Sequence, residues 1–240
     1  MAKIIVLSDI HGNLPALEAA WRDLSSRPVD ALFCLGDLAA FGPFPDECIR
    51  FVRDEMRPTV CLLGNTDRYL LEPPGEPATE RPEDIQDAID WARNQLSADS
   101  LDWLRERPGE ERITLDGVDI ELVHAAPGDD ERGIGPESTG SDLDELFGQH
   151  GPGVTFCGHT HVPFRARRGQ RIIINVGAIG LPFDGDFRAA YARAKCVDGQ
   201  LVHYEPRRVA YPMSRTIESL EERDVPMRAR TERRLRFAER

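Results

Sequence analysis

Three short apolar runs near the start of the chain constrain its fold more than any other feature of the sequence. They are KIIVLS, ALFCLG and TVCLLG, and each is a continuous hydrophobic segment of the kind that forms a strand buried on both faces. The segments between them, residues 13–27 and 45–56, carry apolar residues at helical spacing, and Asn13 is a candidate N-cap. Strands that alternate with helices indicate a parallel sheet whose functional edge lies at the carboxyl ends of the strands.

The remainder of the chain has a different pattern. Residues 72–110 are expected to insert two amphipathic helices, the second capped by Ser97 or Asp99, as a lid or a buttress. From residue 112 onward, alternating runs predict hairpins and a second, more antiparallel sheet. We expect a single domain over residues 1–224, followed by a basic tail over 225–240. The predicted hairpin turns are Asp116-Gly117, Arg168-Gly169 and Asp198-Gly199.

Polar side chains follow the predicted strands where further apolar residues would be expected. Carboxylate, imidazole and amide oxygen ligands suit borderline divalent ions, and the absence of thiolates argues against a structural zinc site. Each such motif alone is usually structural, but together and in this order they favour a metal site. In Asp-x-His and His-x-His, alternation along an extended segment would direct both side chains to one ion cluster, and the preceding glycines would permit sharp turns and close approach to phosphate. The residues concerned are Asp9, His11, Asp37, Asn65, Asp67, His124, His159 and His161.

Composition excludes several classes of protein. The net charge of −12 would repel duplex nucleic acid. No apolar run is long enough to span a bilayer, and the first residues lack a basic segment that leads into a long apolar one. The five cysteines form no CxxC pair. We therefore expect a cytoplasmic protein with no membrane partner. No GxxxxGK motif indicates a nucleotide-driven activity.

The ordered motifs DIHGN, GD, GNTD, VH and GHTH resemble those of the calcineurin-like metallophosphoesterase superfamily, from residue 4 to about 205. The stretches GDLAAFGP and NVGAIGLPFDGDFRAAYA are similar to a branch of small bacterial and archaeal phosphoesterases. The resemblance implies an α/β fold, a four-layer α/β/β/α sandwich of two mixed sheets flanked by helices. It also implies two divalent metal ions, with Mn²⁺ as the first choice and Fe, Zn, Ni, Co or Mg as alternatives. One ion would be held by Asp9, His11, Asp37 and His161, and the other by Asp37, Asn65, His124 and His159.

Two cations that share Asp37 would activate a bridging hydroxide for attack on phosphorus. We expect Asp37, Asn65, Thr66 and Asp67 to take part in catalysis. Many members of the superfamily have histidine at the position of Thr66, and a hydroxyl is a poor general acid near neutral pH. This departure favours activated esters or phosphoanhydrides over esters with poor leaving groups.

The sequence therefore predicts a metal-dependent phosphoesterase that hydrolyses small phosphodiesters or phosphomonoesters. A dinucleoside polyphosphate hydrolase is the first alternative, and a non-catalytic metal-binding scaffold is the second. Arg68 and Arg132 are candidates for contacts to a small phosphorylated substrate, although each is equally well explained as a solvated surface arginine. A homo-oligomer is left open.

Overall fold

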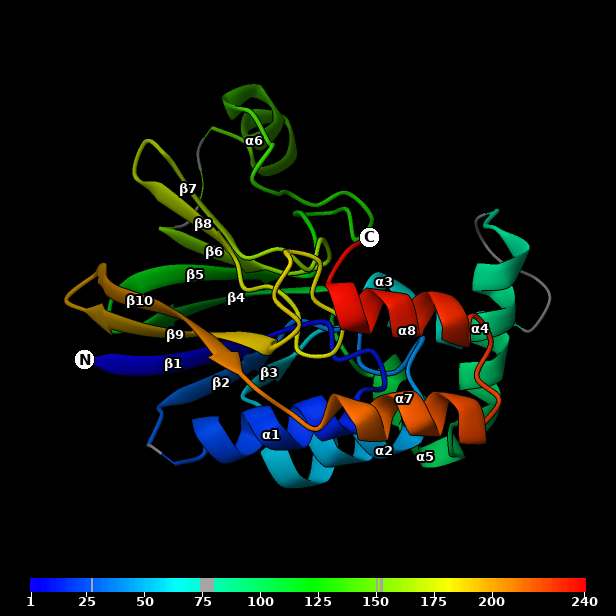
Figure 1. Ribbon diagram of the computed structural model, residues 1–240. Coiled ribbons are helices and arrows are strands. Elements are labelled where there is room, and N and C mark those ends of the chain that lie inside the picture. The colour runs from blue at the N-terminus through cyan, green and yellow to red at the C-terminus, as the bar shows by residue number, and fades with distance from the viewer. Residues whose placement is uncertain (27, 74–79, 150, 152) are drawn as a thin grey trace.

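Two five-stranded sheets lie face to face in the computed structural model, and helices cover their outer faces (Figure 1). The structure describes residues 1–26, 28–73, 80–149, 151 and 153–240. Helices α1 (Leu14–Leu24) and α2 (Pro45–Arg50) lie outside the first sheet, and α6 (Gly140–Phe147) lies outside the second. The predicted four-layer α/β/β/α sandwich is confirmed.

The first sheet has the strand order β10-β9-β1-β2-β3. Its centre is parallel, because β1 pairs with β2 and β2 with β3 in the same direction, as the three apolar runs predict. β9 pairs antiparallel with both β1 and β10. The strand bounds are β1 (Ala2–Leu7), β2 (Ala31–Cys34), β3 (Val60–Cys61), β9 (Ala189–Val197) and β10 (Gln200–Val209).

The second sheet has the order β4-β5-β6-β8-β7 and differs from the sequence prediction. Its three central strands are parallel, and antiparallel pairing is confined to the two edges. The segments that became β9 and β10 were expected here but join the first sheet, because alternation along a strand specifies its faces and not its partners. The strand bounds are β4 (Glu110–Leu115), β5 (Val118–Val123), β6 (Val154–Cys157), β7 (Phe164–Arg168) and β8 (Arg171–Asn175).

Local signals in the sequence set the turns and helix ends. The Asp116-Gly117 turn joins β4 to β5 and Asp198-Gly199 joins β9 to β10, with positive φ at both residues of each turn. Asn13 Oδ1 accepts a hydrogen bond from Ala16 N at 3.3 Å, which confirms the predicted cap of α1. Ser97 rather than Asp99 caps α5, and its Oγ accepts from Ser100 N at 3.2 Å. The remaining helices are η1 (Phe51–Met56, a π-helix), α3 (Asn65–Leu71), α4 (Glu83–Gln95), α5 (Ala98–Arg105), α7 (Met213–Glu222) and α8 (Arg228–Phe237).

Both faces of β1 are buried from Ile4 to Leu7, which explains the continuous apolar run at these four positions. Ile4 and Val6 lie in the core between the sheets, while Ile5 and Leu7 pack against the helices that include α1. Packing on both faces therefore fixes the position of the strand. The loop that follows Leu7 carries Asp9, the first of the predicted metal ligands, and starts from this fixed strand end.

The last residues of the chain, expected as a basic tail, form helix α8. Thr231 and Leu235 are buried, and Leu235 joins a small core with Leu181 and with Leu220 of α7. This core places α8 beside the loop around Leu181, near the carboxyl ends of the central strands (Figure 1). Among the helices of the described residues, none combines the length and the apolar character needed to cross a bilayer.

Candidate metal centre

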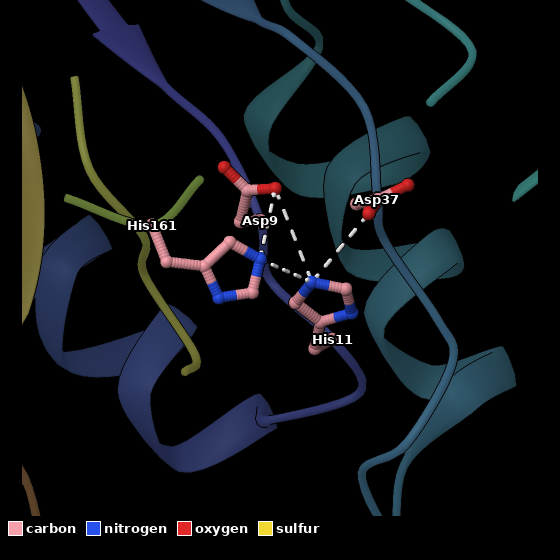
Figure 2. Close-up of side chains that lie close together, drawn as sticks. All are labelled: Asp9, His11, Asp37 and His161. Carbon is pink, nitrogen blue, oxygen red and sulfur yellow. Dashed lines mark hydrogen bonds and ion pairs between the residues drawn. The ribbon is translucent and has the colours of Figure 1, made fainter. Parts of the chain in front are cut away.

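Four of the predicted ligands form one compact cluster. The ligand atoms of Asp9, His11, Asp37 and His161 all lie within 4.8 Å of one another, and all four residues are buried (Figure 2). His11 Nε2 lies 3.0 Å from His161 Nε2 and 3.5 Å from Asp37 Oδ2. His161 Nε2 lies 3.4 Å from Asp9 Oδ1. These separations suit donors that share one cation.

Backbone carbonyls set the orientation of both imidazole rings in this cluster. His11 Nδ1 lies 3.2 Å from Ala40 O, and His161 Nδ1 lies 2.5 Å from Leu181 O. A ring that donates its Nδ1–H to a carbonyl presents a lone pair at Nε2, which is the usual arrangement of a metal-bound histidine. Burial lowers the pKa of His11 to about 4, so its ring is neutral at neutral pH. The donor set therefore fits a divalent ion.

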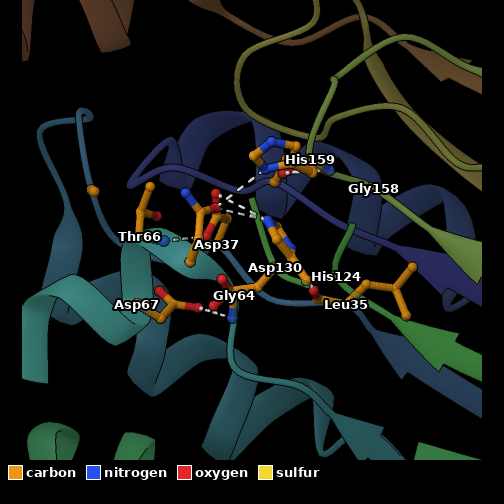
Figure 3. A network of polar contacts seen from close by, with 12 residues as sticks. Leu35, Asp37, Gly64, Thr66, Asp67, His124, Asp130, Gly158 and His159 are labelled. Carbon is orange, nitrogen blue, oxygen red and sulfur yellow. Dashed lines mark hydrogen bonds and ion pairs between the residues drawn. The ribbon is translucent and has the colours of Figure 1, made fainter. Parts of the chain in front are cut away.

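The other predicted ligands form a second cluster on the opposite side of Asp37. His124 Nε2 lies 3.0 Å from Asn65 Oδ1 and 3.5 Å from Asp37 Oδ2. His159 Nδ1 lies 3.3 Å from Asn65 Oδ1. Figure 3 shows the Asp37 carboxylate between the ring of His124 and the backbone of Thr66. Asp37 Oδ2 is thus 3.5 Å from one histidine of each cluster, so the carboxylate lies between the two groups of predicted ligands.

The buried carboxylates of the centre remain ionised. Burial raises the pKa of Asp37, but the charges of His124 and His11 outweigh this effect and lower the pKa well below its usual range. Burial lowers the pKa of His124, but Asp37 outweighs it and raises the pKa to about 10. A proton on His124 balances the carboxylate charge, and a cation at this position would take the place of that proton.

The backbone brings the ligands together in a way that differs from our prediction. Five of the seven have positive φ, a region that non-glycine residues rarely adopt and that costs about 1–3 kcal/mol each. Alternation along an extended segment is therefore the wrong explanation for the Asp-x-His and His-x-His motifs. β1 and β6 end before the ligands, and the side chains converge because the loops turn left-handed. The residues are Asp9 (φ 57°), His11 (49°), Asp37 (57°), His159 (66°) and His161 (61°).

Two glycines allow these loops to touch. A Cβ at Gly64 would overlap the Asp37 carboxylate, and a Cβ at Gly158 would overlap the Ser8 hydroxyl and the Asp9 carboxylate. From the sequence, the backbone at these glycines is expected to approach a phosphate. In the structure it approaches the neighbouring loops that carry Asp37 and Asp9.

Thr66 and Asp67, predicted as catalytic, have different surroundings. Thr66 N donates to Asp37 Oδ1 at 3.0 Å, and Thr66 Oγ1 is buried without a hydrogen-bond partner among the described residues. Asp67 Oδ1 accepts from Leu38 N at 2.9 Å and its Oδ2 from Gly64 N at 3.3 Å. Burial and the charge of Asp37 raise the pKa of Asp67 to about 7. Asp67 therefore connects two ligand loops through their backbones.

The two predicted substrate arginines are ion-paired. Arg68 forms a bidentate contact with Asp130, at 2.7 and 2.9 Å, and Arg132 pairs with Glu145 at 2.6 Å. A contact of either arginine with substrate would have to compete with these carboxylates.

A cavity of about 500 Å³ opens over the centre. Its floor includes His11, Asp37, Asn65, Thr66, His159 and His161. Its walls include residues that sequence reasoning did not identify, namely Phe41, Tyr69, Arg81, Phe183 and Arg234. The Phe183 ring stacks on His161, with centroids 4.4 Å apart. Phe183 lies in the GLPFDGD stretch noted in the sequence, whereas nothing in the sequence pattern indicated that Arg234 reaches the site.

Comparisons with known proteins agree with this geometry. A family model described as a calcineurin-like phosphoesterase superfamily domain matches residues 2–199. An uncharacterized protein from Methanocaldococcus jannaschii is 28% identical over 239 residues, which cover 93% of each chain. A symmetrical bis(5'-nucleosyl)-tetraphosphatase from Actinobacillus pleuropneumoniae is 35% identical over 104 residues, which cover 43% of this chain and 38% of that relative.

Solved structures show the same fold. The crystal structure of a metallophosphoesterase from Sphaerobacter thermophilus has a TM-score of 0.79 at 29% identity, with 98% of both chains covered. A hypothetical protein from Pyrococcus horikoshii has a TM-score of 0.85 at 18% identity, also over 98% of both chains, and this likeness concerns the fold alone.

Proposed function

The chain belongs to the calcineurin-like phosphoesterase superfamily, and from this premise we propose that it hydrolyses small phosphodiesters or phosphomonoesters with two divalent cations, Mn²⁺ foremost. The family resemblance expected from the sequence is confirmed, and the chain is a metal-dependent phosphoesterase. The observation that carries the two-cation proposal is the position of Asp37, whose Oδ2 lies 3.5 Å from a histidine of each cluster.

Each cluster brings together the side chains that we propose as the ligands of one ion. Asp9, His11 and His161 would hold one ion together with Asp37, and Asn65, His124 and His159 would hold the other together with Asp37. When bound, such ions lower the pKa of water and stabilise charge on phosphoryl oxygens. The carbonyls of Ala40, Leu181 and Leu35 fix the ring orientations, so little reorganisation is needed when a substrate arrives.

Thr66 is a proposed contact to substrate. The residue lines the cavity floor and its Oγ1 is buried without a partner among the described residues, so a hydroxyl turned toward the cavity would donate a hydrogen bond to a phosphoryl or leaving-group oxygen. A hydroxyl stabilises such an oxygen but does not protonate it near neutral pH. This favours substrates whose leaving group departs as an anion, such as phosphoanhydrides and aryl esters.

A dinucleoside polyphosphate hydrolase is the second candidate. It is supported by the tetraphosphatase relatives, of whose length the chain spans about 38%, and by the aromatic side chains of Phe41, Tyr69 and Phe183 in the cavity wall. The leaving group of a dinucleoside polyphosphate is a phosphate that departs as an anion, so its hydrolysis does not need a proton from Thr66.

The test is a substrate panel that contains a nitrophenyl diester, a nitrophenyl monoester and a dinucleoside tetraphosphate, run with Mn²⁺, Zn²⁺, Ni²⁺ and Mg²⁺. His161→Ala should abolish turnover of every substrate. His203→Ala is the matched control, because the His203 side chain is 47% exposed and lies outside the centre. Turnover by His161→Ala equal to that of the wild type would overturn the proposal.

A further inference from the structure

Helix α8 contributes one side chain, Arg234, to the cavity over the metal centre. The guanidinium carbon of Arg234 lies 5.2 Å from the centroid of the Phe183 ring, and that ring stacks on His161. One aromatic ring therefore separates the guanidinium from a proposed metal ligand. The position depends on the burial of Leu235, which holds this turn of α8 against Leu181 and Leu220.

Arg234 differs from other arginines around the site because no carboxylate of the described residues forms an ion pair with its guanidinium. Arg68 pairs with Asp130, and Arg81 pairs with Glu72 at 2.6 Å. The guanidinium of Arg234 makes no hydrogen bond or ion pair with any residue that the structure describes, and its Nε is buried without a partner. Burial, reinforced by the charge of Arg230, lowers the pKa of Arg234, and the charge of Asp84, which pairs with Arg230 at 3.2 Å, opposes this shift without offsetting it. An anion bound there would satisfy both the charge and the unused donors.

Two cavities meet at this arginine. The first is the cavity over the metal centre, whose wall is largely aromatic and aliphatic. The second, of about 600 Å³, has a polar lining that includes Arg132, Ser138 and Arg240 together with the carboxylates of Glu131, Glu137, Asp142 and Glu145, and Glu145 is already paired with Arg132. The two share Glu131, His159, Phe183 and Arg234. A substrate that reacts at the centre can therefore place an aromatic group in the first cavity and extend past Arg234 toward the second.

We propose that Arg234 binds a second phosphate, adjacent to the one that reacts, and thereby selects nucleoside di- and polyphosphates in anhydride linkage. A guanidinium donates two parallel hydrogen bonds to a phosphate, and it does so most strongly where no carboxylate competes. The nucleobase lies in the first cavity among Phe41, Tyr69 and Phe183. This inference rests on the proposed function, because it takes the reacting phosphate to lie over the two clusters.

The reaction is a hydrolysis that needs no further reactant. The oxygen of water forms a bond to phosphorus as the bond between phosphorus and the bridging oxygen breaks. The bridging oxygen leaves with the electron pair on the second phosphate, and the protons of water pass to solvent and to the leaving phosphate. Contact with Arg234 stabilises the negative charge that develops on that leaving group. The leaving group can then depart without a proton, which Thr66 does not supply.

The test measures binding directly, by calorimetry on Mn²⁺-loaded protein. The probes are adenosine 5'-(α,β-methylene)diphosphate, adenosine 5'-monophosphate and methylenebisphosphonate without a nucleoside. We expect the nucleoside bisphosphonate to bind most tightly. In Arg234→Met its Kd should rise about tenfold or more, since a charge-assisted hydrogen bond contributes about 1.5–3 kcal/mol, while the Kd of the monophosphate stays within about twofold. Arg234→Lys should keep part of the preference.

Arg234→Met retains an apolar stem over Phe183, so folding should survive the change. Arg236→Met is the matched control on the same helix, because Arg236 is 53% exposed and pairs with Glu232. Equal loss for the bisphosphonate and the monophosphate, or no loss for either, would overturn the role of Arg234. Equal binding of the bisphosphonate with and without its nucleoside would overturn the nucleobase contact.

Kinetics separate this inference from the proposed function. If the protein hydrolyses nitrophenyl phosphates but Arg234→Met leaves KM for a dinucleoside polyphosphate unchanged, only the inference fails. If no phosphoester is hydrolysed but bisphosphonate binding still depends on Arg234, the proposed function fails and the phosphate subsite remains.

Discussion

His11 Nε2 and His161 Nε2 face each other at 3.0 Å, although the two residues are 150 positions apart in the sequence. The Nδ1 atom of each ring faces a backbone carbonyl, so two neutral rings would direct two lone pairs at each other. Lone pairs at this distance repel unless a cation lies beside them. Asp37 Oδ2 lies 3.5 Å from His11 Nε2 and Asp9 Oδ1 lies 3.4 Å from His161 Nε2, so both carboxylates are close enough to share such a cation.

Divalent cations should stabilise the folded protein. An ion at 100 times its Kd contributes about 2.7 kcal/mol, which corresponds to an increase in Tm of about 5 °C or more for a chain of this size. We expect this increase when Mn²⁺ is added to chelator-treated protein, measured by calorimetry. His161→Ala should lose most of the shift and His203→Ala none of it. A shift of full size in His161→Ala would contradict the first ligand set.

Gly64→Ala should disrupt the bridging ligand. The new Cβ would overlap the Asp37 carboxylate, although the backbone of Gly64, at φ −83°, is open to alanine. We expect the metal content after dialysis, measured by elemental analysis, to fall from two ions per chain to one or none. Gly109→Ala is the control, since a Cβ there meets nothing within 4 Å. Two ions retained by Gly64→Ala would show that Asp37 does not bridge.

Thr66→His should supply the missing general acid. We expect turnover of alkyl phosphoesters to rise by about tenfold or more, below the 10²–10⁴-fold that acid catalysis commonly contributes, and by more than turnover of nitrophenyl esters. The reason is that only the poor leaving group needs a proton. Thr66→Asn, a donor that does not titrate, should give no such selectivity. Changes of equal size for both esters would argue against this role.

Asp46 should stabilise the contact between α2 and the start of α5 in a pH-dependent way. Its Oδ1 accepts hydrogen bonds from Ser97 N, Ser97 Oγ and Ser100 Oγ at 3.0, 2.9 and 2.6 Å. Burial raises the pKa of Asp46, but these hydrogen bonds outweigh it and lower the pKa. A lowered pKa gives stability that is present above the unfolded value, about 3.9, and is lost as pH falls through the folded value.

Asp46→Asn should therefore lower the free energy of unfolding by about 1–2 kcal/mol at pH 7, and the difference should shrink below about pH 4. Urea unfolding at several pH values measures both effects. Asp102→Asn, at a side chain that is 72% exposed, should change little at any pH. A difference for Asp46→Asn that stays constant down to pH 2.5 would exclude the ionised carboxylate as its source.

The sequence by itself determined the three parallel strands β1, β2 and β3, the caps at Asn13 and Ser97, the turns at Asp116-Gly117 and Asp198-Gly199 and the identity of the ligand-type residues. These features depend on hydrophobic period and on local backbone chemistry, which act over a few residues. The ligand residues were recognisable because acids and imidazoles followed buried strands, where their cost in stability requires a function.

Only the tertiary structure decided how those residues meet. The left-handed backbone at Asp9 and His161 is unfavourable locally and persists because the packed loops hold it. The placement of β9 and β10 in the first sheet, the pairing of Arg68 with Asp130 and the approach of Arg234 to Phe183 each join segments far apart in the sequence. Such contacts form when distant surfaces bury area together, and no pattern within a single segment encodes them.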